Sequence, residues 1–298
     1  MIDYPAALAV AAVVRTGSFE NAAKALHVTP SAVSQRVKHL EERLGVALIE
    51  RGNPCIATEK GARLCRHMEL VGALENSLLD YLPELGERGT TPVTLDIAVN
   101  SDSLGTWFLS AAADLARSSN ILLNIAVDDQ DHTVDWLRRG RVVAAVTSRS
   151  EPVTGCRATP LGKLQYRATA SPAFLRHYLP NGASAVDMAK APALTFNQKD
   201  SMQQDWLQTF LGITETVPTH WLPSTQGFVD ACLLGLGWCL NPTALVQEHL
   251  ASGRLVELVP DATVDVALHW QVSRMAAHQF PQLDRSIVSA ARATLLRD

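Results

Sequence analysis

Four polar side chains near the N-terminus have the types and spacing that suit recognition of bases in duplex DNA. They are Ser31, Ser34, Gln35 and Arg36. Gln pairs bidentately with adenine, Arg pairs with guanine, and Ser hydrogen-bonds to a base or a phosphate. The nearby Lys38 is suited to a phosphate contact. We therefore expect this segment to enter the major groove if it forms a helix.

Two short helices around a tight turn would present these side chains. The first is predicted to follow Ser18 as its N-cap, with apolar residues at three- and four-residue spacing, namely Phe19, Ala22, Ala23 and Leu26. Thr29 is the predicted cap of the second helix, and Pro30 occupies its first position. The predicted buried face of the second helix comprises Ala32, Val33, Val37, Leu40 and Leu44. An ordinary amphipathic hairpin with a solvated polar face is the alternative.

The segment 18–41 resembles the N-terminal domain of LysR-type transcriptional regulators. The resemblance continues through residues 44–49 and Arg51 to residues 58–61, which in this family form a two-stranded wing and the start of a long helix. It implies that residues 1–59 form a winged helix-turn-helix domain that binds double-stranded promoter DNA. The implied DNA-binding residues are Thr29, Pro30, Ser31, Ala32, Ser34, Gln35, Arg36, Lys38 and Arg51.

Charge is distributed unevenly along the chain. The net charge of the 298 residues is −4, but residues 1–66 contain nine Lys or Arg and six Asp or Glu, whereas residues 89–298 contain sixteen and nineteen. A weak positive field is thus confined to the predicted DNA-binding end, and a dimer would present two such domains. Two features reduce the expected phosphate contacts of the wing: Ile56 replaces an expected basic residue, and Glu50 adjoins Arg51.

Composition indicates a globular protein of two or three folding units, since 47% of the residues are hydrophobic. The five cysteines include no Cys-x-x-Cys pair, and their odd number argues against a closed disulfide framework. We find neither a secretion signal nor an uninterrupted apolar run of about 20 residues. These observations lead us to expect a cytoplasmic protein that does not enter a membrane.

Residues 60–89 are predicted to be a linker, helical over 60–88. Its apolar seam consists of Leu64, Met68, Val71, Leu74, Leu78 and Leu82. Packing against its own domain is one interpretation, whereas the family resemblance implies pairing with a second subunit in a homodimer or homotetramer. Breaks at Pro83, Gly86, Gly89 and Pro92 mark the domain boundary.

Residues 90–298 alternate between strand and helix patterns, which predicts an α/β domain with largely parallel sheets. We expect strands at 93–99, 122–127, 142–146, 193–196 and 237–240, and helices at 103–116, 133–139, 203–211 and 227–234. The chain is expected to cross between two lobes near 161–166 and to return near 266–270. This pattern resembles the periplasmic-binding-protein-like effector domain of the same regulators, with lobe I at about 90–163 and 268–298 and lobe II at about 164–267.

Polar residues follow several of these strands, where a small ligand is expected to bind. The candidate effector-binding residues are Asn100, Ser101, Asp102, Ser103, Thr147, Asn197, Ser224, Thr225 and Gln226. Hydroxyls beside helix N-terminal amides bind a carboxylate well, although each group alone is more often a plain N-cap. Asp102 would accept hydrogen bonds from a ligand ammonium group. A carboxylate-binding group and an ammonium-binding group side by side match an α-amino acid. Stabilisation of the helix dipole by Asp102 is an equally strong alternative.

Residues 99–108 resemble the corresponding segment of the lysine- and arginine-export activators within this family, as do 145–147, 155–156 and 235–238. The resemblance implies sensing of lysine or arginine and control of an amino-acid exporter or related metabolic gene. The resemblance implies an acidic residue at position 226, where this chain has Gln226. A contact to a cationic side chain would be weaker there, so an effector with less positive charge is an alternative. Asp128 and Asp129 would replace that acid if their loop faces the cleft, but a solvated acidic turn is the simpler interpretation.

An enzyme is not supported, because no Gly-x-Ser-x-Gly elbow, P-loop or His-Glu-x-x-His motif is present. Cys65 and His67 lack further ligands at a useful spacing for a metal, and Gly235-x-Gly237 is too short for a dinucleotide fingerprint. We expect no cofactor besides the amino-acid effector, and RNA polymerase is a further candidate partner. A ligand-independent DNA-binding protein remains the second alternative, although it leaves the two-lobed domain unexplained.

Overall fold

The computed structural model describes residues 2–82, 84, 92–128 and 133–297. They form two compact units. The first comprises residues up to Leu95 together with 120–122 and 139–141, and the second contains the remainder. Pro83, Gly86 and Gly89, which are predicted to break the linker helix, lie outside the described residues.

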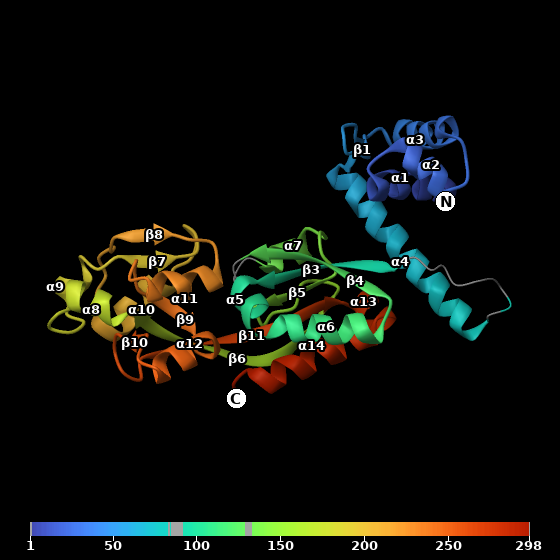
Figure 1. The fold of residues 1–298 in the computed structure, drawn as a ribbon. Coiled ribbons are helices and arrows are strands. Elements are labelled where there is room, and N and C mark those ends of the chain that lie inside the picture. The colour runs from blue at the N-terminus through green and yellow to red at the C-terminus, as the bar shows by residue number, and fades with distance from the viewer. Residues whose placement is uncertain (1, 83, 85–91, 129–132, 298) are drawn as a thin grey trace. The chain divides into compact units, whose positions relative to one another are not determined.

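The first unit begins with a cluster of three helices (Figure 1). They are α1 (Tyr4–Thr16), α2 (Phe19–Ala25) and α3 (Pro30–Leu44). Both predicted caps are confirmed: Ser18 Oγ accepts the Asn21 N–H at 3.1 Å, and Thr29 Oγ1 accepts the Ala32 N–H at 3.2 Å. The sequence analysis did not predict α1. A signal for its start was present in the sequence, since Asp3 is the N-cap and its carboxylate accepts the Ala6 N–H.

The core of this cluster includes Val33, Val37 and Leu40 of α3, as predicted. Leu44 was predicted to join them, but it is 51% exposed. It is the last residue of α3, and the chain turns back at Gly45 with a φ of 66°, so its side chain falls beyond the packed face. Ala32 is only half-buried.

The predicted wing is confirmed as two short strands, β1 (Ile49–Glu50) and β2 (Ile56–Ala57), which pair antiparallel. Glu41 holds the wing to α3, since its carboxylate accepts the N–H groups of Leu48 and Ile49 at 2.7 and 3.2 Å. Thr58 then caps the next helix by accepting the Gly61 N–H.

That helix, α4 (Glu59–Tyr81), extends away from the α1–α3 cluster (Figure 1). It is shorter than the predicted 60–88. Its seam divides into two parts: Met68 is buried and Leu64 packs against the cluster, whereas Leu74, Leu78 and Leu82 are each about half exposed. The end of the seam is therefore apolar and uncovered within the described chain.

The second unit is built on a seven-stranded sheet of order β10-β6-β11-β5-β3-β4, with β9 paired to β6. The strands are β3 (Val93–Asn100), β4 (Ile121–Asp128), β5 (Ala144–Thr147), β6 (Cys156–Ala170), β9 (Cys239–Pro242), β10 (Val256–Glu257) and β11 (Thr263–Ser273). Figure 1 shows β6 and β11 running between two lobes, as the predicted crossings require. The nine strands and helices predicted between residues 93 and 240 all form, with shifted ends.

The prediction of largely parallel sheets was wrong. β3 pairs parallel with β5, but β11 is antiparallel to β5 and β6, and β6 is antiparallel to β9 and β10. The reason is topological, because one long strand leaves the first lobe and the other returns to it. Two neighbouring strands that carry the chain out and back must run in opposite directions.

Helices cover the sheet in both lobes. The first lobe contains α5 (Ser101–Ser103), a π-helical turn η2 (Leu104–Phe108), α6 (Leu109–Ser118), α7 (Thr133–Arg138), α13 (Arg274–Gln279) and α14 (Pro281–Thr294). The second contains α8 (Pro172–Tyr178), α9 (Ala185–Met188), α10 (Met202–Leu211), α11 (Thr225–Leu233), α12 (Thr243–Ala251) and the parallel pair β7 (Ala193–Thr195) and β8 (Thr219–Trp221). The elements that the sequence analysis missed here are α8, α9, β8, α12, β10, α13 and α14.

All five cysteines are free thiols. Burial and the neighbouring Glu69 raise the pKa of Cys65 to about 11, so this thiol is protonated at neutral pH. Among the described residues, no helix is both long and apolar enough to span a bilayer.

Candidate DNA-recognition surface and effector pocket

The polar side chains at the start of α3 are on the surface of the first unit. Ser31, Gln35 and Lys38 are exposed, and Ser34 and Arg36 are partly exposed. Lys38 Nζ lies 3.7 Å from Glu42 Oε1 on the next turn of the helix. Thr29 serves as the cap, and the exposed Pro30 and half-buried Ala32 complete the first turn. The face is therefore accessible to a large partner without unfolding the domain.

Arg51 lies directly after β1 and is exposed. Its guanidinium carbon is 5.5 Å from the centroid of the Phe19 ring, so the cation is held beside the start of α2. Ile56 is 51% exposed and pairs with Glu50 across the wing. The wing thus presents the cation of Arg51, and the apolar Ile56 stands where a second basic residue was expected.

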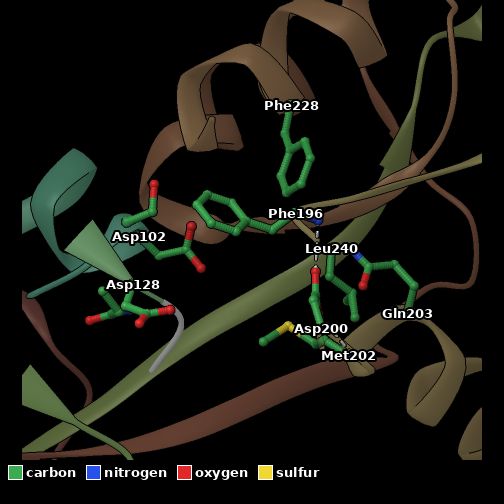
Figure 2. A pocket seen from close by; sticks show the side chains of 10 residues that line it. Asp102, Asp128, Phe196, Asp200, Met202, Gln203, Phe228 and Leu240 are labelled. Carbon is green, nitrogen blue, oxygen red and sulfur yellow. Dashed lines mark hydrogen bonds between the residues drawn. The ribbon is translucent and has the colours of Figure 1, made fainter. Parts of the chain in front are cut away.

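A pocket in the second unit is lined by Asn100, Ser101, Asp102, Asp128, Phe196, Asp200, Met202, Gln203, Phe228 and Leu240. The empty space in and in front of the pocket, open solvent included, is about 380 Å³. Figure 2 shows Asp102 and Asp128 on one side of the pocket and Asp200 with Gln203 on the other, with the Phe196 ring between them.

Asp102 joins residues from three separate segments. Its Oδ1 lies 2.6 Å from Thr225 Oγ1 at the start of α11, and its Oδ2 accepts the Tyr166 hydroxyl of β6 at 2.7 Å. Thr225 Oγ1 is also 2.7 Å from Ser101 Oγ. Burial raises the pKa of Asp102 above its ordinary value, although the bonds from Thr225 and Tyr166 oppose that shift. Its carboxylate therefore does more than stabilise a helix dipole.

Asn100 ends β3 and occupies the cap position of α5, yet its side chain makes no capping hydrogen bond. It is 1% exposed, and neither atom of its amide has a hydrogen-bond partner among the described residues. Buried amides are normally paired, so an unpaired amide in the wall of a pocket is a candidate ligand contact.

Six predicted effector residues are not among those that line this pocket: Ser103, Thr147, Asn197, Ser224, Thr225 and Gln226. Ser103 and Thr147 are buried. Asn197 Oδ1 accepts the Lys199 N–H, and Ser224 Oγ accepts the Gly227 N–H as a plain N-cap. Gln226 is exposed, and its amide lies 3.5 Å from Asp230 Oδ1.

Several pocket residues were missed by the sequence analysis: Tyr166, which holds Asp102, and the lining residues Phe196, Asp200, Met202, Gln203, Phe228 and Leu240. Asp200 carries a usable signal, because it lies three residues beyond the predicted Asn197 after a buried strand. Asp128 does line the pocket, with Trp136 Nε1 donating to it at 3.1 Å, so its solvated-turn interpretation was wrong. Asp129 lies outside the described residues.

Three carboxylates, those of Asp102, Asp128 and Asp200, line the same pocket. Such a site favours a cation, because a positive ligand stabilises all three negative charges. No group of His, Cys, Asp and Glu in the described ranges is arranged to hold a metal ion. A winged helix-turn-helix in one unit and a pocket lined by acidic and polar side chains in the other define a ligand-responsive DNA-binding regulator.

Comparison with known proteins agrees with this class. Residues 7–62 match the model of the bacterial regulatory helix-turn-helix proteins of the lysR family, and residues 89–285 match the LysR substrate binding domain. The chain belongs to the LysR family of transcriptional regulators. The family consists of transcription factors rather than enzymes.

Full-length relatives extend the match. The chain is 39% identical over 297 residues to the transcriptional regulator ArgP of Pseudomonas aeruginosa. The aligned region covers 100% of this chain and 98% of that relative. It is similar to the crystal structure of ArgP from Mycobacterium tuberculosis, with 37% identity, a TM-score of 0.77 and full coverage of both chains. It is also similar to full-length LysG from Corynebacterium glutamicum with bound effector Arg, with 33% identity, a TM-score of 0.67, and 99% and 100% coverage.

Proposed function

We propose that this regulator senses a basic amino acid, lysine or arginine, and controls transcription of an amino-acid exporter or a related metabolic gene. The observation that carries the proposal is the set of three carboxylates lining one pocket. The 39% identity to a regulator named ArgP and the similarity to a LysG structure with bound Arg support the same effector class.

In this proposal Asp102 binds the α-ammonium group, and Asn100 and Ser101 hydrogen-bond the α-carboxylate. Asn100 supports this assignment because its buried amide has no partner in the described chain. Thr225 acts through Asp102, since its hydroxyl lies 2.6 Å from that carboxylate. Gln226, Asn197, Ser103, Thr147 and Ser224 then have supporting roles away from the ligand.

We assign DNA binding to the winged helix-turn-helix within residues 1–59, with Gln35 and Arg36 recognising bases. Lys38 and Arg51 contact phosphates. We place the linker at 60–89 and the effector-binding domain at 90–298. Self-association through α4 is supported by the exposed leucines Leu74, Leu78 and Leu82, which need an apolar partner. Effector binding changes the arrangement of the two lobes and thereby the position of paired DNA-binding domains on the operator.

Calorimetry of the full chain with lysine, arginine, histidine and neutral amino acids tests the effector class. We expect heat of binding for lysine or arginine and none for neutral amino acids. A Gln226→Ala variant serves as the control, and it should bind as the unmodified chain does because Gln226 is exposed and outside the pocket.

Footprinting tests the link between effector and DNA. The operator DNA is first selected from a random pool, and the footprint of the protein on it should change when the binding amino acid is added. An unchanged footprint with every basic amino acid would overturn the effector assignment.

A further inference from the structure

Gln203 presents a buried hydrogen-bond acceptor to the pocket. The residue lies in the first turn of α10, is 5% exposed and lines the pocket. Its Nε2 donates to the Leu194 carbonyl at 2.8 Å. Since a carbonyl can only accept, this bond fixes which end of the amide is nitrogen. The opposite atom, Oε1, is buried and accepts no hydrogen bond from the described residues.

An acceptor in this position has a cost that a ligand would remove. Leaving a buried polar atom unpaired forfeits its hydration without replacing it, and native structures rarely tolerate this without a reason. Because the Leu194 carbonyl holds Nε2, the Gln203 amide cannot turn over, and Oε1 stays in this position. A ligand that enters this side of the pocket must therefore bring an N–H or O–H group to Oε1.

Asp200 lines the same pocket as Gln203 and supplies negative charge (Figure 2). Its Oδ2 accepts the Phe196 N–H, and its Oδ1 accepts the Met202 N–H, each at 3.0 Å. Two backbone bonds hold the carboxylate in place at the start of α10. Asp200 and Oε1 of Gln203 thus provide two acceptors, one charged and one neutral, each held in a fixed orientation.

The wall next to them is aromatic. Phe196 and Phe228 line the pocket, and the Phe196 ring lies between the Asp102 side and the Asp200 side in Figure 2. A guanidinium group is planar, stacks on aromatic faces and carries five N–H donors in a fork, whereas an ammonium is a compact point charge with three donors. Two acceptors beside an aromatic face match the guanidinium better.

We propose that Asp200 and Gln203 form the side-chain subsite of the effector pocket and select a guanidinium, so that arginine is preferred to lysine. This inference rests on the proposed basic amino-acid effector. Asp102 on the opposite side keeps the α-ammonium, and the aliphatic part of the ligand passes along Phe196.

Titration calorimetry of the full chain with arginine, lysine and citrulline tests the preference without any substitution. Citrulline has the shape of arginine but is neutral, so it separates charge from hydrogen bonding. We expect arginine to bind about tenfold or more tighter than either lysine or citrulline, as loss of a charge-assisted hydrogen bond predicts. A preference for lysine overturns the subsite. Absence of binding by both basic amino acids overturns the proposed function as well.

The variant Gln203→Met removes the acceptor while keeping the side-chain volume. It should reduce the arginine preference over lysine to about threefold or less, because the lost acceptor matters to the guanidinium alone. Gln208→Leu is the matched control, since Gln208 lies on the same helix but is exposed and outside the pocket. Thermal unfolding checks that each variant is folded. An unchanged arginine-to-lysine ratio in folded Gln203→Met overturns the role of Gln203, and Asp200→Asn provides the second variant if Gln203→Met does not fold.

Discussion

The polar side chains of α3 and those of the effector pocket are held in opposite ways. Gln35 and Lys38 stand in solvent on one helix, whereas Asp102 is buried and hydrogen-bonded to Thr225 and Tyr166. A solvated group can be replaced with little effect on folding. Replacing a buried carboxylate changes the packing around it and the proton that it binds, so it also changes stability. The comparison teaches that substitutions in α3 report on recognition alone, while those in the pocket report on recognition and stability together.

The largest effect is expected from Asp102→Asn in the pocket. Removing one partner of a buried, hydrogen-bonded charge pair costs about 2–5 kcal/mol, so affinity for a basic amino acid should fall at least about 30-fold. Calorimetry measures the loss. Asp230→Asn is the control, because Asp230 is an exposed acid outside the pocket. Unchanged affinity in Asp102→Asn would show that the ammonium binds elsewhere.

A smaller effect, on stability, is expected at the junction of the wing and α4. A Cβ at Gly61 would lie 1.8 Å from the Leu48 carbonyl oxygen, so Gly61→Ala forces the backbone apart and should cost about 1–3 kcal/mol. Gly72→Ala on the same helix meets nothing within 4 Å and should stabilise by about 0.5–1 kcal/mol. Thermal unfolding distinguishes them. Equal melting temperatures for the two variants would contradict this packing.

Gln35→Ala should reduce discrimination between the operator and a mismatched site by about 1–3 kcal/mol, and Arg36→Ala should act similarly. Arg51→Ala should instead weaken binding to all DNA more evenly, because a phosphate contact carries no sequence information. Competition binding with operator and mismatched duplexes measures both. If operator preference survives in Gln35→Ala and Arg36→Ala, then α3 does not read the bases.

The smallest effect is a pH dependence that belongs to the pocket. Burial raises the pKa of Asp102, so this carboxyl group holds its proton more tightly than an ordinary aspartate does. The contribution of Asp102 to stability is therefore lost as pH rises through that pKa and regained as pH falls. A cationic ligand needs the carboxylate, so its affinity should fall as pH drops through the same range, by at most about tenfold, or 1.4 kcal/mol, per pH unit. Calorimetry at a series of pH values measures this slope. Asp102→Asn should flatten it, and a slope retained in that variant would assign the proton to another group.

The sequence was sufficient to predict the helix-turn-helix because its determinants are local. A cap such as Ser18 or Thr29 acts on an N–H three residues away, and apolar spacing fixes which face of a short helix is buried. The two crossings between the lobes were also expected from the pattern, but the long antiparallel strands that make them were not. Leu44 was misplaced because burial at a helix end depends on where the chain turns next.

Only the tertiary structure decided the composition of the pocket. Asp102 meets Tyr166 across 64 positions and Thr225 across 123, so no local pattern brings these residues together. The same is true of Gln203, whose unpaired Oε1 is visible only once Leu194 is seen to occupy its Nε2. The sequence by itself determined that this chain has a DNA-binding domain and a two-lobed sensor domain, since helix caps and strand patterns act over short distances. Which side chains face a ligand was decided by packing between distant segments.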